Sequence, residues 1–349
     1  MQAAVAARMQ ICKMNDAVGV CDMEIEKLEV SKHGDTRRLY EEVFAEDAKS
    51  FVDYYYQEKT KDNIIYIVRE DDDIQAMLHL NPYTLKVNGN EKKSYYIVAV
   101  ATRKEYRGRK YMAKLIERSL QDMYQKGVTF TYLMPAAEAI YLPHDFRTVY
   151  EQNISYYDPK EKPEEDVQVQ EAVNEKCTEI AAWAEAHLAK QYQVYARRDR
   201  AYYERLIKEL ACEDGKLMVY RKNGEITDVR PYYAGEESAK DEENAKIMIR
   251  IVDVRRMLMS LRLRSLIAVS FQVTDSLIPD NNRYITMTGT EFSGLMLMEG
   301  RPETSEGVLT IGALGELIFG AKTVEEIGQE PEVAMSERMM SELKKIIPL

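Results

Sequence analysis

The stretch VAVATRKEYRGRKYMAKLI, residues 98 to 116, changes its character halfway along. It starts as an apolar strand pattern, passes through a loop with five basic residues among the eight from Arg103 to Lys110, and continues as a helix pattern. Arg107-Gly108 stands directly before that helix, where unpaired backbone N–H groups and about half a positive charge gather. The stretch therefore predicts an anion site, with phosphate as the expected occupant.

The motif alone leaves two interpretations open. The GxxxxGK[ST] spacing of a Walker loop is absent, and a single glycine does not make a dinucleotide fingerprint. A phosphate site and an ordinary solvated helix start fit the pattern equally well.

The net charge of −11 argues against nucleic-acid binding, which needs a broad basic face. A small polyanion suits a local basic cluster better.

The segments around this loop alternate between strand and helix patterns. Strand patterns and a turn at Asn88-Gly89-Asn90 predict an antiparallel meander before the loop, with runs at 64–68, 74–80, 83–87 and 95–102. Apolar residues at helical spacing predict an amphipathic helix from Arg109 to Gln125, ended by Gly127. Residues 129–134 return to a strand pattern. The order is strand, basic loop, helix, strand.

The chain of 349 residues is too long for one ordinary core, and two or three domains are expected. Charged stretches at 158–166 and 235–246 mark boundaries. Between them the patterns predict helices over 174–210 and a hairpin over 217–229 that turns at Asn223-Gly224. Later patterns predict helices at 250–261 and 336–346, strands at 265–273 and 283–288, core alternation in GLMLMEG, and a short strand followed by a helix at 310–320.

Composition predicts a soluble protein of a reducing cytoplasm. No apolar run approaches the roughly 20 residues that a membrane span requires, and the first 22 residues lack the apolar core of a secretory signal. The spacing of the cysteines fits neither a zinc site nor a disulfide scaffold, and the histidines are isolated, so no metal is expected: Cys12, Cys21, Cys177, Cys212, His33, His79, His144 and His187.

Three segments together resemble known acetyltransferases. VAVAT, RKEYRGRKYM and the following helix and strand resemble the acyl-coenzyme A motif of the Gcn5-related N-acetyltransferases (GNAT). EAIY, residues 138–141, resembles the segment after the fifth strand in the enhanced intracellular survival (Eis) family. LTIGALGELIFGAKTVEEI, residues 309–327, resembles the sterol-carrier-protein-like domain of that family.

The resemblance implies an α+β fold with tandem GNAT-like domains, each a mixed sheet flanked by helices, followed by a sterol-carrier-protein-like α+β domain. The expected divisions are an N-terminal extension at 1–22, a coenzyme-binding domain at 23–155, a degenerate second copy at 156–245 and the last domain at 246–349. The second copy has no Arg-Gly loop, so only the first is expected to bind coenzyme.

The resemblance also implies a site for acetyl-CoA as co-substrate. The backbones of Val98 and Val100 would pair with the pantetheine arm, while the loop would hold the pyrophosphate through Arg103, Tyr106, Arg107, Gly108, Arg109, Lys110 and Tyr111. Tyr141 would protonate the leaving thiolate as general acid, and the carboxylate of Leu349 would accept the amine proton as general base. Lys110, Glu105 and Ala136 depart from the residues usual at their positions.

Each role has a structural alternative. Tyr141 is one of 24 tyrosines, most of which pack with a polar tip. Val98 and Val100 also suit an ordinary strand core, and Glu138 is either a receiver of a cationic amine or a solvated carboxylate. Leu349 is either a frayed end or, because Ile346-Ile347-Pro348 before it are apolar, a docked one.

The leading functional interpretation is direct transfer of acetyl from acetyl-CoA to a primary amine, on a small molecule or a lysine side chain. The acceptor itself is not identified by the sequence. The resemblance further implies a homo-oligomer, expected to be a ring-like hexamer. The competing interpretations are a non-catalytic binder of apolar ligands and a scaffold that keeps the GNAT fold.

Overall fold

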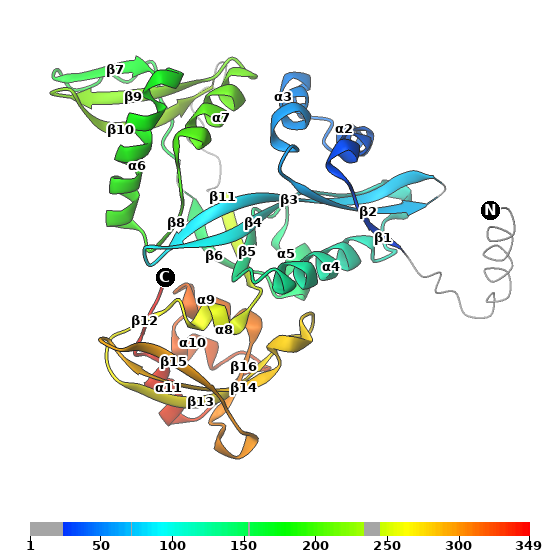
Figure 1. The fold of residues 1–349 in the computed structure, drawn as a ribbon, viewed down its shortest axis with the longest axis vertical. Coiled ribbons are helices and arrows are strands. Elements are labelled where there is room, and N and C mark those ends of the chain that lie inside the picture. The colour runs from blue at the N-terminus through cyan, green and yellow to red at the C-terminus, as the bar shows by residue number, and fades with distance from the viewer. Residues whose placement is uncertain (1–23, 71, 153, 234–244) are drawn as a thin grey trace, which may run out of the picture.

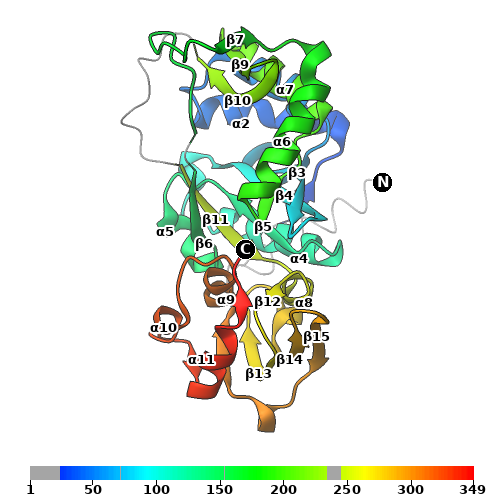
Figure 2. The same cartoon turned by 90° about the vertical axis from the view of Figure 1, so that its left-hand side faces the viewer.

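The computed structural model describes residues 24–70, 72–152, 154–233 and 245–349. The predicted extension at 1–22 and nearly all of the predicted boundary at 235–246 lie outside these residues. A large twisted sheet with helices occupies the middle of the molecule (Figures 1 and 2). A smaller, three-stranded sheet with two helices lies at one end, and a body that contains a five-stranded sheet lies at the other.

The large sheet has the strand order β1-β2-β3-β4-β5-β11-β6, and β8 pairs with β3 beside this path. Its strands are β1 Ile25–Lys27, β2 Ile64–Glu70, β3 Asp73–Val87, β4 Asn90–Thr102, β5 Phe130–Leu133, β6 Arg147–Gln152, β8 Val194–Ala196 and β11 Ala245–Ile251. The antiparallel meander is confirmed. The two runs predicted at 74–80 and 83–87 are one long strand, because Pro82 stays in the ladder opposite Tyr95.

Two hairpin turns have the backbone that their sequences predict. Asn88 and Gly89 have φ of 50° and 83°, and Asn223 and Gly224 have φ of 53° and 85°. Positive φ at both central residues is the requirement of the two-residue hairpin turn that matches strand twist, and Asn-Gly meets it best.

Helices cover both faces of the large sheet. Met77 packs with α2 (Arg37–Val43) and α3 (Lys49–Tyr54), while its neighbour Leu78 packs with α4 (Tyr111–Gln125), since successive strand residues face opposite sides. Helix α4 starts two residues later than predicted because Lys110 is left-handed, with φ of 63°. Short helical turns occupy Val30–Thr36, Tyr55–Lys59, Lys104–Tyr106, Leu142–His144, Asn174–Lys176, Pro279–Asn281 and Pro302–Thr304.

The unit between β6 and β11 has a three-stranded sheet of its own. Strands β7 (Val167–Glu171), β9 (Lys216–Lys222) and β10 (Glu225–Tyr232) lie in the order β10-β9-β7. Helices α6 (Cys177–Gln191) and α7 (Arg200–Ala211) share its apolar core. The predicted hairpin is confirmed, and the predicted helical region is two helices separated by β8.

The sequence-based boundary at residues 245 and 246 differs from the structure. Strand β11 (245–251) belongs to the large sheet, where Met248 pairs with Leu133 of β5 and Ile247 pairs with Tyr150 of β6. The helix predicted from Arg250 is wrong at its start, because Arg250 and Ile251 end this strand. The helical turns begin only at Val254, after Asp253 accepts a hydrogen bond from the Arg256 amide at 3.0 Å.

The C-terminal body is built on a sheet of order β15-β14-β13-β16-β17, with β12 and β18 paired beside it. The strands are β12 Arg262–Leu263, β13 Ile267–Thr274, β14 Arg283–Thr290, β15 Gly294–Glu299, β16 Gly307–Thr310, β17 Ala334–Met335 and β18 Ile346–Ile347. The helices are α8 Val254–Leu258, α9 Ile311–Ile318, α10 Val324–Ile327 and α11 Glu337–Leu343. The predicted strands at 265–273 and 283–288 are confirmed, as are the short strand and helix at 310–320.

Two features join this body to the large sheet. Helix α9 is buried all round, and a Cβ added to Gly315 would lie 3.0 Å from Ile249 Cδ1 of β11. The Arg250 guanidinium donates to the Asp275 carboxylate at 2.5 Å, and both side chains are fully buried. Asp275 also accepts from the amides of Leu277 and Ile278, so its charge is fully engaged.

A buried histidine makes the fold sensitive to acid. His79 is fully buried, with Nδ1 at 2.9 Å from the Tyr55 hydroxyl. Burial lowers the pKa of His79 to about 3, and the charge of His33 acts in the same direction. An unfolded histidine titrates near 6.5, so below that pH protons bind the unfolded chain preferentially and stability is lost as pH falls towards 3.

We expect His79 to lower the free energy of unfolding by about 1.4 kcal/mol per pH unit below about pH 6. Urea denaturation at pH 7, 6 and 5 would measure this slope. His79→Leu should flatten it, whereas His187→Leu, at a partly exposed position, should leave it unchanged. An identical slope in wild type and His79→Leu would contradict the assignment.

Candidate active site

The basic loop leads from β4 into α4. The chain passes the turn at Lys104–Tyr106 and reaches the helix through two left-handed residues, Gly108 at φ 81° and Lys110 at φ 63°. Within the described residues, the amides of residues 108–113 donate to no acceptor. A row of free amides at the start of a 15-residue helix is the arrangement that binds phosphate oxygens.

Side chains of the loop add positive charge around these amides. Arg107, Arg109 and Lys110 are exposed, and no atom lies within 4 Å of a Cβ built on Gly108. The Arg109 guanidinium lies over the Tyr106 ring at 4.5 Å from its centroid, and its Nη1 is 3.2 Å from Glu70 Oε2. The Tyr111 hydroxyl also bonds Glu70, so β2 steadies the base of the loop.

Arg103 differs from the other loop residues. Its guanidinium is bonded to Asp73 at 2.8 Å, to Glu42 at 3.0 Å and to Gln75 at 3.0 Å, and its side chain is only 12% exposed. These partners come from α2 and β3, so the side chain joins α2, β3 and β4. The expectation that the Arg103 side chain faces a phosphate is therefore not supported by its contacts.

Strands β4 and β5 separate just beside the loop. Within the described residues, β4 and β5 pair at a single position, Tyr96 with Tyr132. Strand β5 then ends at Leu133, whereas β4 continues to Thr102. The register of β4 against β3 shifts here, and Ala99 has φ of 49°. The backbone of Val98 and Val100 thus lies on a strand edge without a β5 partner, where an extended chain can pair.

Tyr141 lies at the end of α5 (Glu138–Tyr141), the short helix that follows β5. It is 8% exposed and packs against the Phe146 ring at 5.9 Å between centroids. Burial raises the pKa of Tyr141, which keeps its proton on the oxygen. Burial likewise raises the pKa of Tyr96 to about 12, and Tyr83 and Tyr141 contribute to that rise. Tyr141 and Tyr96 therefore share one electrostatic environment.

Glu138 is occupied by neighbours within the chain. One carboxylate oxygen bonds the Thr148 hydroxyl, and the other lies 2.9 Å from Lys246 Nζ of β11. Hydrogen bonds from these two partners lower the pKa of Glu138. The interpretation of Glu138 as receiver of a substrate amine is therefore not supported. The Glu138 side chain instead connects α5 to β11.

The C-terminus is docked. The Leu349 amide donates to Ile318 O of α9 at 2.8 Å, and Ile346 and Ile347 form the short strand β18. The Leu349 side chain packs against the apolar cluster that also receives Tyr83 and Tyr132. The last residue is thus held on the side of the large sheet where these two tyrosines lie, and the frayed-end alternative is wrong.

A tyrosine cluster that the sequence patterns did not indicate lies beside the strand separation and is formed by Tyr83, Tyr96 and Tyr132. Tyr132 is stacked on Tyr96 at 5.4 Å and lies edge-on to Tyr83 at 6.1 Å between ring centroids. All three rings are partly exposed. The alternation of Asn81, Tyr83 and Leu85 was a signal for a shared face, but the pairing across strands was not readable from sequence.

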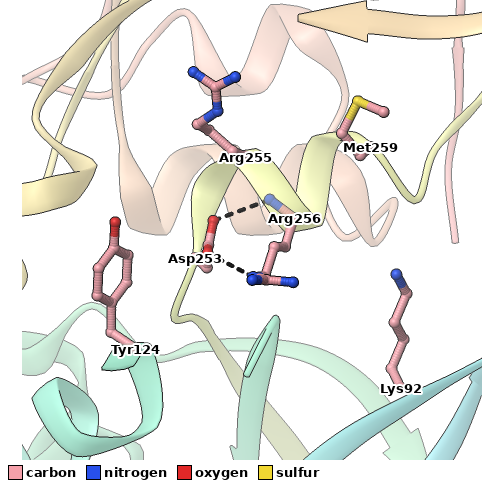
Figure 3. Close-up of a pocket in the computed structure, with 6 residues that line it drawn as sticks. All are labelled: Lys92, Tyr124, Asp253, Arg255, Arg256 and Met259. Atoms are coloured by element: carbon pink, nitrogen blue, oxygen red, sulfur yellow. Dashed lines mark hydrogen bonds and ion pairs between the residues drawn. The ribbon is translucent and has the colours of Figure 1, made fainter. Parts of the chain in front are cut away.

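A cavity of about 400 Å³ lies elsewhere, between the end of α4, the start of β4 and α8 (Figure 3). Its lining residues are Lys92, Tyr124, Asp253, Arg255, Arg256 and Met259. Asp253 Oδ2 is 3.1 Å from Arg256 Nε. Tyr124 is close to the C-terminal end of α4, roughly 20 Å along the helix from the basic loop. This cavity and the strand separation are therefore different places.

No cluster of three or more His, Cys, Asp or Glu side chains suited to a metal ion occurs among the described residues. Over the same residues, every helix is too short or too polar to cross a bilayer.

Residues 24–149 match the model of the acetyltransferase (GNAT) domain. This match covers β1 to the start of β6, including the basic loop, the strand separation and Tyr141. The first part of the chain is therefore an acetyltransferase domain of the GNAT N-acetyltransferase family. No curated protein sequence matches the chain.

Solved structures share the fold over nearly the whole chain at low identity. A protein from Enterococcus faecalis V583, described as a probable N-acyltransferase, is 13% identical with a TM-score of 0.75 over 93% of this chain and 97% of its own. A GCN5-related N-acetyltransferase from Anabaena variabilis is 14% identical, with a TM-score of 0.67 over 93% and 97%. Eis1 from Mycobacterium abscessus is 12% identical, with a TM-score of 0.67 over 94% and 97%. These similarities extend the shared fold into the small sheet and the C-terminal body.

Proposed function

We propose that the GNAT domain at residues 24–149 binds acetyl-CoA and transfers its acetyl group directly to a primary amine. The observation that carries this proposal is the row of unpaired amides at residues 108–113, set beside an open edge of β4. The amides suit the pyrophosphate, and the edge at Val98 and Val100 suits the amide groups of the pantetheine arm. Arg107, Arg109 and Lys110 supply charge from the solvent side.

In this proposal Tyr141 and Leu349 carry the proton transfers. When the amine nitrogen bonds to the thioester carbon, the C–S bond breaks and the Tyr141 hydroxyl gives its proton to the departing sulfur. The Leu349 carboxylate accepts the proton that the nitrogen loses. The buried hydroxyl, whose pKa is raised, supports the role of acid. The docked C-terminus, on the side of the sheet where Tyr83 and Tyr132 lie, supports the role of base.

The wider assignment follows the Eis-like arrangement. The predicted span 156–245, which holds the three-stranded sheet, would be the degenerate second copy, and the C-terminal body would be the sterol-carrier-protein-like domain, as the match to Eis1 over 94% of this chain supports. The acceptor is expected to be an amine-bearing small molecule or a lysine side chain, and the assembly a homo-oligomer.

Calorimetric titration of acetyl-CoA into the protein tests the coenzyme site. Gly108→Glu is expected to lower the affinity at least tenfold, because it puts a carboxylate at the free amides and a side chain on a backbone with φ of 81°. Gly224→Glu is a matched control, since Gly224 has φ of 85° and equally open surroundings in the β9–β10 turn. Equal affinity in the Gly108 and Gly224 variants would reject the loop as the site.

Extension of the chain by two glycines after Leu349 tests the base. Moving the carboxylate off its docked position is expected to lower kcat at least tenfold, with acetyl-CoA affinity unchanged. Steady-state kinetics would measure the effect, and the melting temperature would show whether the C-terminal body is intact. Full activity of the extended chain would reject Leu349 as the base.

A further inference from the structure

Arg198 is a charged residue that the proposed function leaves unexplained. It lies between β8 and α7, and its guanidinium is 5.8 Å from the Tyr202 ring centroid. The guanidinium hydrogen-bonds the neutral Tyr203 side chain, but its Nε is buried and has no hydrogen-bond partner among the described residues. None of the carboxylates in the described residues lies within ion-pair distance of Arg198. Its neighbour Arg197, in contrast, pairs with Glu91 and Asp199. A partly buried cation normally has an anionic partner.

The register of β8 places Arg198 beside the tyrosine cluster. Leu85 pairs with Ala196, and the Arg197 amide donates to Thr84 O at 2.9 Å. Continued by one residue, the register sets Arg198 opposite Tyr83. Residues opposite each other share a face of a sheet, so Arg198 lies on the face that carries Tyr83 and Tyr132.

Helix α7 borders the surface that carries Arg198 and the tyrosine cluster. Lys59 binds Glu209 at 2.8 Å and Arg205 binds Asp62 at 3.0 Å, which fastens α7 to the first domain. Burial raises the pKa of Tyr132, and Tyr83, Tyr96 and Tyr202 contribute to that rise, so Tyr202 of α7 shares the environment of the cluster. The rings therefore extend from the separation of β4 and β5 to Arg198.

We propose that this aromatic surface binds the acetyl acceptor, and that the acceptor carries a carboxylate at the end remote from its amine. Arg198 receives the carboxylate, the rings of Tyr83, Tyr132 and Tyr202 hold a flat apolar body, and the amine reaches the separation of β4 and β5. Two strand spacings across the sheet and two to four residues along β3 separate these ends, roughly 12–16 Å between backbones. The long Arg198 side chain spans part of that distance. The inference rests on the proposed acetyl transfer and names its class of substrate.

A matched pair of acceptors tests the proposal. 4-(2-aminoethyl)benzoate and 2-phenylethylamine differ only in the carboxylate. Wild type is expected to use the benzoate about tenfold more efficiently or better, judged by kcat/KM, because a charge-assisted bond to Arg198 is gained. In Arg198→Met the ratio of the two kcat/KM values should fall to about one. Arg198→Lys should keep part of the wild-type preference for the benzoate. Arg197→Met, which alters the neighbouring arginine, should keep all of that preference.

A binding experiment separates this inference from the catalytic proposal. 4-Ethylbenzoate has the ring and carboxylate but no amine, and it should raise the melting temperature of wild type and Arg197→Met but not of Arg198→Met. If 4-ethylbenzoate stabilises the protein in this way while neither amine is acetylated, the carboxylate site is supported and the proposed acetyl transfer to amines is rejected. If both amines are acetylated equally well by wild type, the transferase stands and the carboxylate site is overturned. A loss in Arg198→Met that is equal for both amines overturns it too.

Discussion

Tyr141→Phe is expected to lower kcat by at least about 100-fold, within the range that positioned acid catalysts contribute. The substitution keeps the ring that packs against Phe146 and removes only the hydroxyl. The acetyl-CoA dissociation constant from calorimetry should stay within about twofold of wild type, since the loop at 108–113 is untouched. The expected change is thus in turnover alone.

Tyr124→Phe is the matched control, because Tyr124 lies near the far end of α4 and lines the separate cavity. It should leave kcat unchanged. The raised pKa of Tyr141 also predicts that its hydroxyl stays protonated throughout the range below about pH 10, the ordinary tyrosine value. A kcat that falls at pH 8 to 9 in wild type and not in Tyr141→Phe would contradict the assignment, as would full turnover of the variant.

Asp275→Ala is expected to lower the free energy of unfolding by roughly 3–5 kcal/mol, because it leaves the fully buried Arg250 guanidinium without its carboxylate. Two amide donors, at residues 277 and 278, lose their acceptor as well. Urea denaturation would measure the loss. The C-terminal body should be the first part of the molecule to unfold at a lower urea concentration.

Two comparisons sharpen this test. Asp228→Ala removes a carboxylate that is 39% exposed and 2.7 Å from Arg230, and it should cost less than about 1 kcal/mol. The double variant Arg250→Met/Asp275→Leu should recover much of the stability lost in Asp275→Ala, because an apolar pair carries no buried charge. If Asp275→Ala costs no more than Asp228→Ala, the buried pair does not stabilise the joint.

Local patterns predicted the parts of the site that depend on neighbours in the chain. The meander, the basic loop, the helix after it and the turn at Asn88-Gly89 follow from periodicity and from residues with fixed backbone preferences. The left-handed backbone of Lys110 moved the helix start by two residues, because lysine gives no signal for that conformation.

Relations between distant segments were not predictable. The acids that occupy Arg103 come from residues 42 and 73, and a basic side chain in a motif does not reveal such partners. The tyrosine cluster depends on the register of β3, β4 and β5, which a single strand pattern does not give. Strand β11 was mistaken for the start of a helix because a short apolar run suits either element. The roles of Tyr141 and Leu349 remain predictions from the resemblance.

Strand β11 has a consequence for how the molecule is made. The chain leaves the large sheet at Gln152 and supplies the strand between β5 and β6 only at Ala245, about ninety residues later. At roughly 5–20 residues per second on the ribosome, β5 and β6 wait on the order of ten seconds for their shared neighbour. During that time both present unpaired edges, the state in which nascent sheets aggregate or recruit chaperones. A fragment that ends at residue 155 would stay in that state permanently.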